Sequence, residues 1–330
     1  MPTFCRHNRL IQNCPICSRE QAIELRPIVT SSAPRTGQPR PSPAGPRRAR
    51  PAAAQRAGAG GGVTVRRVAR GSEDGYRNSL VIGLKSSADA RRLAEEIAFA
   101  EHRLRVLEHA PPGLYAEVAD AGANLEERTW LAFLIAYLGP LEGEHPFAEI
   151  TRSRTSWASG QSPSLEGIGT GPRTAHDPAR GPRTLDAYRM WAGRAGSQAV
   201  AFTGEAAWTP ERRFARAFER LALPGLHRDA RFELLVSLGR LGVYDVRAAS
   251  LALGGVNDVT VGAKRAFGIG DPLLLERRAS DLAGACGIPL ETLDLGLHNW
   301  QRGERDTVGL GVDSEPEPEA VAGVQAALGL

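Results

Sequence analysis

Residues 238–271 read "LGRLGVYDVRAASLALGGVNDVTVGAKRAFGIGD". Two short helix-like apolar segments are joined by the turn "LGVY", and a Gly turn then carries Asp258. Lys264 and Arg265 follow six and seven residues later, and the chain has only one other lysine, Lys85. An acid at a turn followed by a basic pair suggests a shared site. Asp is also a favoured helix cap, so capping alone could explain Asp258 and leave the basic pair in solvent.

The segments around this stretch predict a mainly α body. Residues 124–138, "NLEERTWLAFLIAYL", are apolar nearly all round and begin with acids, which favours a central helix. A longer helix is expected after Ser86 or Ser87, because apolar residues follow at helical spacing until Pro111. Further helices are predicted from Thr184, from Thr209, and over 228–239, 245–253, 260–267, 273–286 and 289–300. Residues 151–183 suit a long loop, and only 62–69 ("GVTVRRVA") and 198–202 ("QAVAF") suit short strands.

The first twenty residues contain a Cys/His cluster. Its order is C-x-H-x6-C-x2-C, formed by Cys5, His7, Cys14 and Cys17. Three thiolates and one imidazole complete a tetrahedron, which is the ligand set of a closed structural zinc site. The alternative is a disordered tail with redox-active thiols. Cys286, far from this cluster, suits a small core residue.

We expect one tightly bound zinc ion per chain, because four such ligands leave no open coordination position. Elemental analysis of the purified full-length protein should give near-stoichiometric zinc, and the Cys14→Ser/Cys17→Ser variant should lose it. A wild-type protein free of zinc would rule out this site.

A basic segment follows the cluster. Between Glu24 and Glu73 there is no acidic residue, while ten arginines occur there (Arg26, Arg35, Arg40, Arg47, Arg48, Arg50, Arg56, Arg66, Arg67 and Arg70). Residues 26–62 are rich in Pro, Gly, Ala and Arg, which is typical of a disordered linker. Such an arm suits a polyanion such as DNA, or it is a solvated linker with biased composition.

The sequence thus predicts four parts: a zinc knuckle (1–20), a basic disordered linker (21–75), a helical domain (76–303) and an acidic tail with a short helix (304–330). The longest apolar run, Trp130 to Leu138, is too short to span a bilayer, and no apolar signal segment begins the chain. We therefore expect no membrane association. A cytoplasmic protein is predicted, associated with the nucleoid if it binds DNA.

The pattern around Asp258, together with "ERTWLAFLIAYL", resembles the helix-hairpin-helix DNA glycosylase superfamily. More specifically, residues 86–303 look like the α-glutamyl/putrescinyl thymine pyrophosphorylase group, clade 3 type. This resemblance implies a DNA-modifying transferase that acts on a flipped, hypermodified thymine. Asp258 would be catalytic, and Lys264 with Arg265 would stabilise a leaving pyrophosphate. An upstream base kinase or hydroxylase would be the expected partner enzyme.

The resemblance also implies that the hairpin contacts DNA, through Arg240, Gly242, Tyr244 and Arg247. Leu241 replaces the expected Pro, and Tyr244 replaces a Gly that would let the backbone approach a phosphate. Val246 occupies the place of a lyase lysine, which argues against Schiff-base chemistry.

Three alternatives remain open. "LPGLH" at 223–227 also fits a hairpin and would make Asp245 the catalytic acid. The reaction could instead be hydrolytic, as in a DNA glycosylase, or the chain could be a non-catalytic zinc-containing DNA-binding adaptor. Asp294, His298 and Asn299 also fall near one helical face, where Asp294 and His298 suit either a proton relay or a structural contact.

Overall fold

The computed structural model describes residues 71–311 and 314–330, which form one compact unit. This part of the chain contains twelve α-helices and no strand, so the mainly α prediction is confirmed. The helices are α2 (Ser87–His109), α3 (Leu114–Ala119), α4 (Leu125–Leu138), α5 (Ala148–Ser153), α6 (Gly181–Ala195), α7 (Gln198–Thr203), α8 (Pro210–Arg220), α9 (Arg228–Arg240), α10 (Asp258–Phe267), α11 (Pro272–Cys286), α12 (Thr292–Arg302) and α13 (Pro318–Ala327). None of them is long and apolar enough to cross a membrane.

Helices α2 and α4 each begin directly after a residue whose side chain caps the helix. The Ser86 hydroxyl accepts a hydrogen bond from the Asp89 amide, which starts α2. The Asn124 side chain accepts from the Glu126 and Glu127 amides, which starts α4. Both caps satisfy amide groups that have no partner inside the helix.

Helix α4 is the centre of one group of helices, α3 to α9. Every residue from Arg128 to Leu138 is buried, as its nearly continuous apolar sequence predicts. Trp130, Phe133 and Tyr137 stack along one face, and Tyr188 of α6 lies over Phe133 with 3.7 Å between ring centroids. Each aromatic pair adds about 0.5–1.5 kcal/mol beyond its area burial, so this stack fixes α6 on α4.

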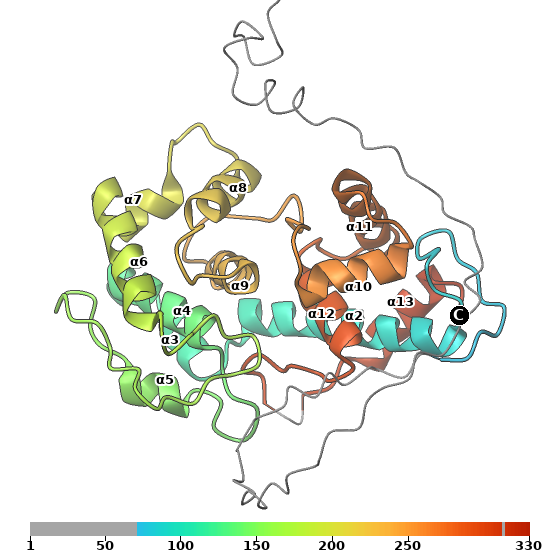
Figure 1. The fold of residues 1–330 in the computed structure, drawn as a ribbon, viewed down its shortest axis with the longest axis horizontal. Helices are drawn as coiled ribbons and strands as arrows, with labels where there is room; N and C mark the ends of the chain where they lie inside the picture. Colours follow the sequence, from blue (N-terminus) through green and yellow to red (C-terminus); the bar gives the residue numbers. More distant parts are fainter. Residues whose placement is uncertain (1–70, 312–313) are drawn as a thin grey trace, which may run out of the picture. The chain divides into compact units, whose positions relative to one another are not determined.

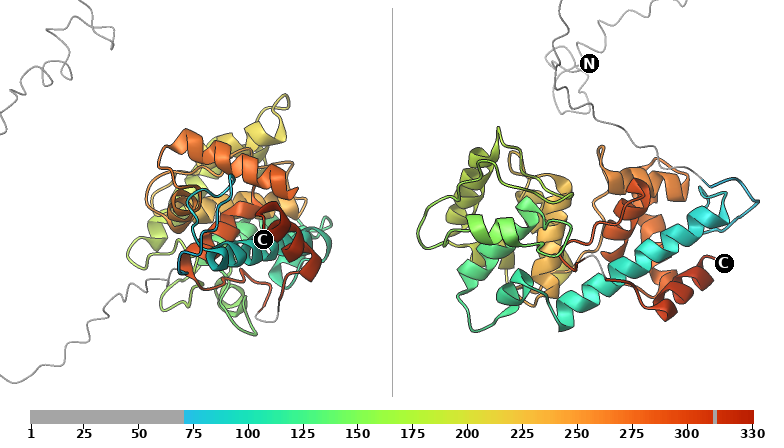
Figure 2. Two further views of the ribbon diagram at one scale, coloured as in Figure 1. Left: turned by 90° about the vertical axis from the view of Figure 1, so that its right-hand side faces the viewer. Right: turned by 90° about the horizontal axis from the view of Figure 1, so that it is seen from below.

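The second group consists of α10 to α13, and α2 runs along it (Figures 1 and 2). Helix α12 packs on α2, and α10 packs on α12. The α10–α12 approach is close at Gly262, where a Cβ atom would lie 2.7 Å from the Leu297 carbonyl oxygen. Helix α13 also packs on α2, and the Tyr76 hydroxyl donates to the Leu328 carbonyl (2.6 Å). The predicted C-terminal helix is therefore present, and it belongs to the same compact unit as the helical domain.

The helix predicted over 245–253 is wrong. Helix α9 ends at Arg240, and no helix follows until α10. The amides of Leu251 and Leu253 donate to the two carboxylate oxygens of Glu276 in α11, at 2.7 and 2.6 Å. Because a side chain from another helix takes these donors, the segment stays irregular, with Ala252 at φ +51°, and buries most of its apolar residues without forming a helical turn.

The strand predicted over 198–202 is also wrong, since these residues lie in α7. The Ser197 side chain caps α7 by accepting from the Val200 amide (3.1 Å). The Glu126 carboxylate accepts from the Gln198 and Ala199 amides, at 3.0 and 2.9 Å. Negative charge at these free amides favours a helix start.

The predicted zinc ligands Cys5, His7, Cys14 and Cys17 lie outside the described residues, as do the predicted strand at 62–69 and most of the linker at 21–75. Within the described ranges, no group of three or more His, Cys, Asp or Glu side chains is placed to hold a metal ion.

Candidate functional site

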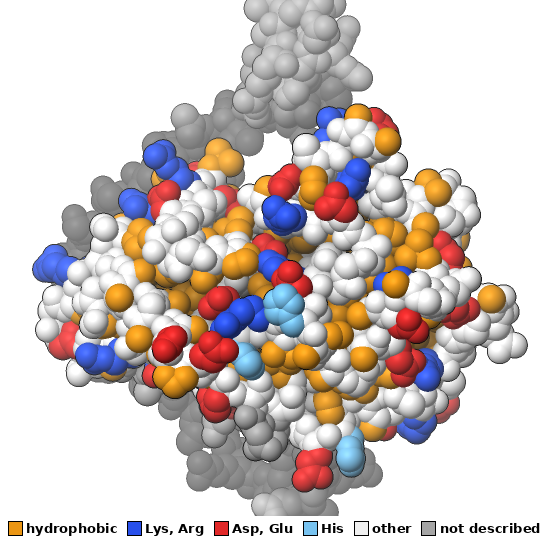
Figure 3. All heavy atoms as spheres, turned by 180° about the vertical axis from the view of Figure 1, so that it is seen from behind, with side chains coloured by type: hydrophobic (Ala, Val, Ile, Leu, Met, Phe, Trp, Pro, Cys, Tyr) orange, Lys and Arg blue, Asp and Glu red, His pale blue; other side chains and the backbone are white. Residues whose placement is uncertain are grey.

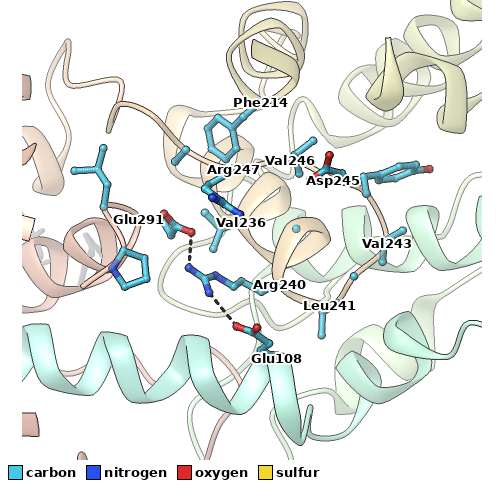
Figure 4. A pocket seen from close by; sticks show the side chains of 16 residues that line it. Glu108, Phe214, Val236, Arg240, Leu241, Val243, Asp245, Val246, Arg247 and Glu291 are labelled. Atoms are coloured by element: carbon cyan, nitrogen blue, oxygen red, sulfur yellow. Dashed lines mark hydrogen bonds and ion pairs between the residues drawn. The ribbon is translucent and has the colours of Figure 1, made fainter. Parts of the chain in front are cut away.

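Ion pairs join the two helix groups where α9 faces α12. The Arg240 guanidinium reaches Glu108 of α2 (3.0 Å) and Glu291 just before α12 (2.6 Å) (Figure 4). Deeper in the junction, the Asp294 carboxylate of α12 accepts from Arg173 (2.6 Å) and from Arg228 at the start of α9. Charged side chains therefore connect the two helix groups. Arg240 and its partners line one of the two cavities described below, and Arg173 and Arg228 line the other.

Asp294 is the buried centre of this junction. Burial alone would raise the pKa of the Asp294 carboxyl, but Arg228 and Arg173 lie beside it and hold its pKa below the ordinary value. Arg228 also donates to the Leu251 carbonyl and so links the irregular 245–253 segment to the same carboxylate. Asp294 thus connects α12 with Arg173, with the start of α9 and, through Arg228, with the 245–253 segment.

A cavity of about 580 Å³ opens at the N-terminus of α10, and Asp258 lies on its wall. The other charged or titratable side chains that line it are Arg173, His227, Arg228, Asp229, His298 and Arg302. The close approach of α10 and α12 at Gly262 brings the first turn of α10 and the second half of α12 to the same cavity. We call this cavity the Asp258 pocket.

Capping does not explain Asp258. The cap of α10 is Asn257, whose side-chain oxygen accepts from the Thr260 amide at 2.8 Å. Asp258 is the first helical residue, is half-buried, and its carboxylate has no hydrogen-bond or ion-pair partner among residues 71–311 and 314–330. The carboxylate is consequently available to a molecule in the pocket.

Several buried polar atoms around this pocket lack partners. The Nε and Nη1 atoms of Arg173, the Nε of Arg228 and the Nδ1 of His298 make no hydrogen bond within the described part of the chain. Buried polar groups in folded proteins are almost always paired, so each such atom calls for an explanation. These atoms are enclosed by neighbouring side chains and have almost no accessible surface, so they do not themselves point to a ligand in the pocket.

Lys264 and Arg265 are not among the residues that line the Asp258 pocket. They lie in the last turn of α10, about 9 Å along the helix axis from Asp258 at 1.5 Å per residue. Lys264 is exposed. Arg265 forms an ion pair with Asp89 (3.0 Å) and lies over the Trp300 ring, 4.2 Å from its centroid. The cations of the pocket come instead from Arg173, Arg228 and Arg302.

The predicted DNA-contacting hairpin lines a second cavity, of about 850 Å³, between 239–248 and 289–291 (Figure 4). Arg240, Gly242, Arg247 and the alternative acid Asp245 all lie along it. Gly242 has φ +66° and open space beside its Cα, and the Arg247 side chain is exposed. Asp245 is exposed and pairs with Arg213 (2.8 Å), so it differs from the half-buried, unpaired Asp258.

Tyr244, the remaining residue of the predicted DNA contact, is buried. Its ring is buried and stacks on Phe202 with 5.3 Å between centroids. Its hydroxyl is 2.7 Å from that of Thr129 in α4, and burial raises the pKa of Tyr244 to about 12. The Tyr244 side chain thus attaches the turn after α9 to α4.

The surface bears on the DNA hypothesis as well. On the face drawn in Figure 3, basic and acidic side chains alternate and no continuous basic band is formed. If this face binds a polyanion, it would do so through single exposed arginines. The Arg-rich N-terminal sequence is the other candidate for polyanion binding.

Sequence reasoning missed Arg173 and Arg228 as pocket residues. Arg173 lies in the Ser/Gly/Pro-rich segment that suits an exposed loop, yet it is buried against Asp294. No periodic or motif signal marks it. The helical spacing of Asp294 and His298 singled out both residues in the sequence. Their partners in the structure, Arg173 and Arg228 for Asp294 and Asp306 for His298, lie outside α12.

Comparison of the chain with protein-family models, with curated proteins and with solved structures gives no match. The function is accordingly argued from the pocket itself.

Proposed function

We propose that this protein binds DNA and acts on a modified thymine base in the Asp258 pocket, as a pyrophosphorylase or transferase. One observation carries the proposal. Asp258 is a half-buried residue that lines a cavity of about 580 Å³, its carboxylate has no partner within the described residues, and Arg173, Arg228 and Arg302 line the same cavity. Enzymes that work on a base in duplex DNA must first extrude it into such a pocket.

The pocket supplies the groups that a displacement at the thymine 5-substituent needs. The nitrogen lone pair of an amine forms a bond to the methylene carbon, and the carbon–oxygen bond to pyrophosphate breaks. The bonding electrons leave with the pyrophosphate oxygen, where Arg173, Arg228 and Arg302 are the cations that would stabilise the charge. Asp258 would stabilise the positive nitrogen or accept its proton. An upstream base kinase or hydroxylase would have to prepare such a substrate.

Two alternatives have specific support. A hydrolytic DNA glycosylase would use the same unpaired Asp258 to stabilise positive charge on the sugar. In a non-catalytic zinc-containing DNA-binding adaptor, the Arg-rich N-terminal segment would carry the DNA binding, because Tyr244 is buried and Glu108 and Glu291 balance the charge of Arg240.

Nucleoside analysis separates these functions. DNA that carries 5-substituted thymines, including pyrophosphorylated ones, would be incubated with the full-length protein and candidate amines, then digested and analysed by mass. An amine-linked thymine supports the transferase. Release of free base in its place supports the glycosylase, and unchanged DNA that nonetheless binds the protein supports the adaptor.

All three functions require DNA binding, and we expect it to weaken steeply with salt. Each phosphate contact lowers the slope of log K against log salt by about 0.9 for duplex DNA. Removal of residues 1–70 should flatten this slope strongly, because ten arginines lie between residues 26 and 70. Fluorescence anisotropy over a salt series measures it.

Single-residue variants sharpen this test. Arg247→Ala should flatten the slope by about one phosphate contact. Arg194→Ala, which changes an exposed arginine of α6 outside both cavities, is the matched control. Absence of binding at low salt would contradict every DNA function, along with the nucleoid association that depends on DNA binding.

A further inference from the structure

Helix α8 carries a row of three arginines on its exposed side. Arg212, Arg216 and Arg220 follow one another at four-residue spacing, and all three side chains are exposed. At 3.6 residues per turn they fall within an arc of about 80° and are spaced about 6 Å apart along the helix axis. The opposite side of the helix buries Phe214 and Ala217. We call the three exposed residues the α8 arginine row.

Trp208, just before α8, positions both ends of this row. The guanidinium carbon of Arg212 lies 5.3 Å from the centroid of the Trp208 ring, and that of Arg220 lies 5.6 Å from it. Trp208 itself is buried. A cation–π contact orients a guanidinium group but leaves its positive charge and its N–H donors available to an anion.

The charge of the row is largely unbalanced. Neither Arg212 nor Arg220 forms an ion pair within residues 71–311 and 314–330, where the Trp208 ring is the contact of both guanidinium groups. Arg216 pairs with Glu219 (3.0 Å), but both of these side chains are at least half exposed, and such surface pairs contribute little. An incoming anion therefore meets three guanidinium groups and one weakly bound carboxylate.

The row is connected at both ends to the segments that form the two cavities. The Arg247 amide donates to the Pro210 carbonyl (3.2 Å), which brings the exposed Arg247 of the hairpin cavity to the first turn of α8. Near the other end, the Arg231 side chain donates to the Phe218 carbonyl (3.1 Å). The last turns of α8 thus lie beside the first turn of α9, in which Arg228 lines the Asp258 pocket.

The charge of α8 is opposite to that of the folded part of the chain as a whole. Residues 71–330 contain 28 Lys or Arg and 35 Asp or Glu residues, so their formal net charge is −7. Helix α8 contains four Arg and two Glu residues, which gives +2. A polyanion is repelled by the net charge of this domain, so it would bind at a local basic surface. Basic residues clustered along one helix are typical of a nucleic-acid contact.

We propose that the α8 arginine row binds the phosphate backbone of duplex DNA, an inference that rests on the proposed function for the identity of the polyanion. A guanidinium group can donate two parallel N–H bonds to one phosphate. Three such groups in a line suit a chain of phosphates better than a single small anion. Contacts of this kind fix the position of the duplex and read no base sequence. The row would hold DNA while the Asp258 pocket receives the base.

The test uses the full-length protein and a short fluorescein-labelled duplex of unmodified DNA, with anisotropy measured over a salt series. In Arg212→Gln/Arg216→Gln/Arg220→Gln, the slope of log K against log salt should become shallower by about 1.8–2.7, which corresponds to two or three lost phosphate contacts. The three side chains are exposed, so Tm should be nearly unchanged. Arg212→Lys/Arg216→Lys/Arg220→Lys keeps the charges and should keep most of the slope.

A charge-matched control comes from other parts of the domain. Arg77→Gln/Arg91→Gln/Arg277→Gln removes the same number of positive charges from three exposed arginines that lie outside α8 and outside both cavities. If DNA binds along α8, this variant should change the slope by less than one contact, about 0.9.

The outcomes separate this inference from the proposed function. A wild type that does not bind the duplex at low salt would overturn both. A wild type that binds, and whose glutamine row variant keeps the same slope, would overturn the inference alone and would leave the row to another kind of partner, such as an acidic protein surface. Equal losses in the row and control variants would also overturn it, because binding would then follow net charge. Loss of the slope in the lysine variant would do so as well, because the positive charges are still present.

Discussion

Replacing Asp294 by alanine is expected to lower the free energy of unfolding by about 3–5 kcal/mol, since it removes one partner of a buried ion-pair cluster. Asp294 is the common acceptor of Arg173 and Arg228, and the Arg173 and Asp294 side chains are each only 4% exposed. Arg173 would then be buried without its ion-pair partner, and Arg228 would keep only its ion pair with Asp229 (3.1 Å). Urea unfolding followed by circular dichroism measures the change.

A matched control comes from an exposed acid in the same helix group. Asp281→Ala, in α11, should change the stability by no more than about 0.5 kcal/mol. A loss below about 1 kcal/mol for Asp294→Ala would show that the cluster contributes little to stability, contrary to the ordinary effect of breaking a buried pair.

The Asp294 carboxylate should also make the stability of the fold sensitive to acid. The pKa of Asp294 is lower in the folded chain than its ordinary value, so the unfolded state binds more protons in acid. Its contribution to stability is present above the ordinary carboxyl range and is lost as the pH falls through the lowered pKa. Asp294→Asn should therefore be less stable near neutrality and should show a flatter loss of stability in acid than the wild type.

Asp258→Asn is expected to reduce the activity on thymine-modified DNA at least 10²-fold while the chain stays folded. The carboxylate is half-buried and has no partner in the described residues, so its neutralisation should alter the unfolding free energy by no more than about 0.5 kcal/mol. The rate of pyrophosphate release measures the activity. Lys264→Ala serves as the control, because Lys264 is exposed at the far end of α10.

The helices were largely predictable because their signals are local. The Ser86 and Asn124 caps and the continuous apolar run of α4 lie within the segments that they organise. The 245–253 segment differs, since its conformation depends on Glu276 in another helix. The short apolar run of 198–202 suits a strand or a helix equally, and the Glu126 carboxylate from α4 favours the helix.

The candidate site was predictable only at single positions. Spacing singled out Asp258 and His298, but it could not show that Arg265 is bound to Asp89 or that Arg173 joins Asp294 across 121 residues of sequence. In the sequence Tyr244 was assigned to a predicted DNA-contacting turn. In the structure its hydroxyl contacts that of Thr129, a residue 115 positions away in the sequence. Partners of this kind are determined by the packing of segments that are far apart in the sequence, which no local pattern contains.

The most direct test of the account compares two acids on one substrate. Wild-type protein, Asp258→Asn and Asp245→Asn would be incubated with the same thymine-modified DNA and amine, and the nucleosides would be quantified by mass. The account predicts an amine-linked thymine from the wild type, almost none from Asp258→Asn, and near wild-type amounts from Asp245→Asn, whose carboxylate is exposed and paired with Arg213. Full activity in Asp258→Asn with loss in Asp245→Asn would contradict it and would move the chemistry to the hairpin cavity.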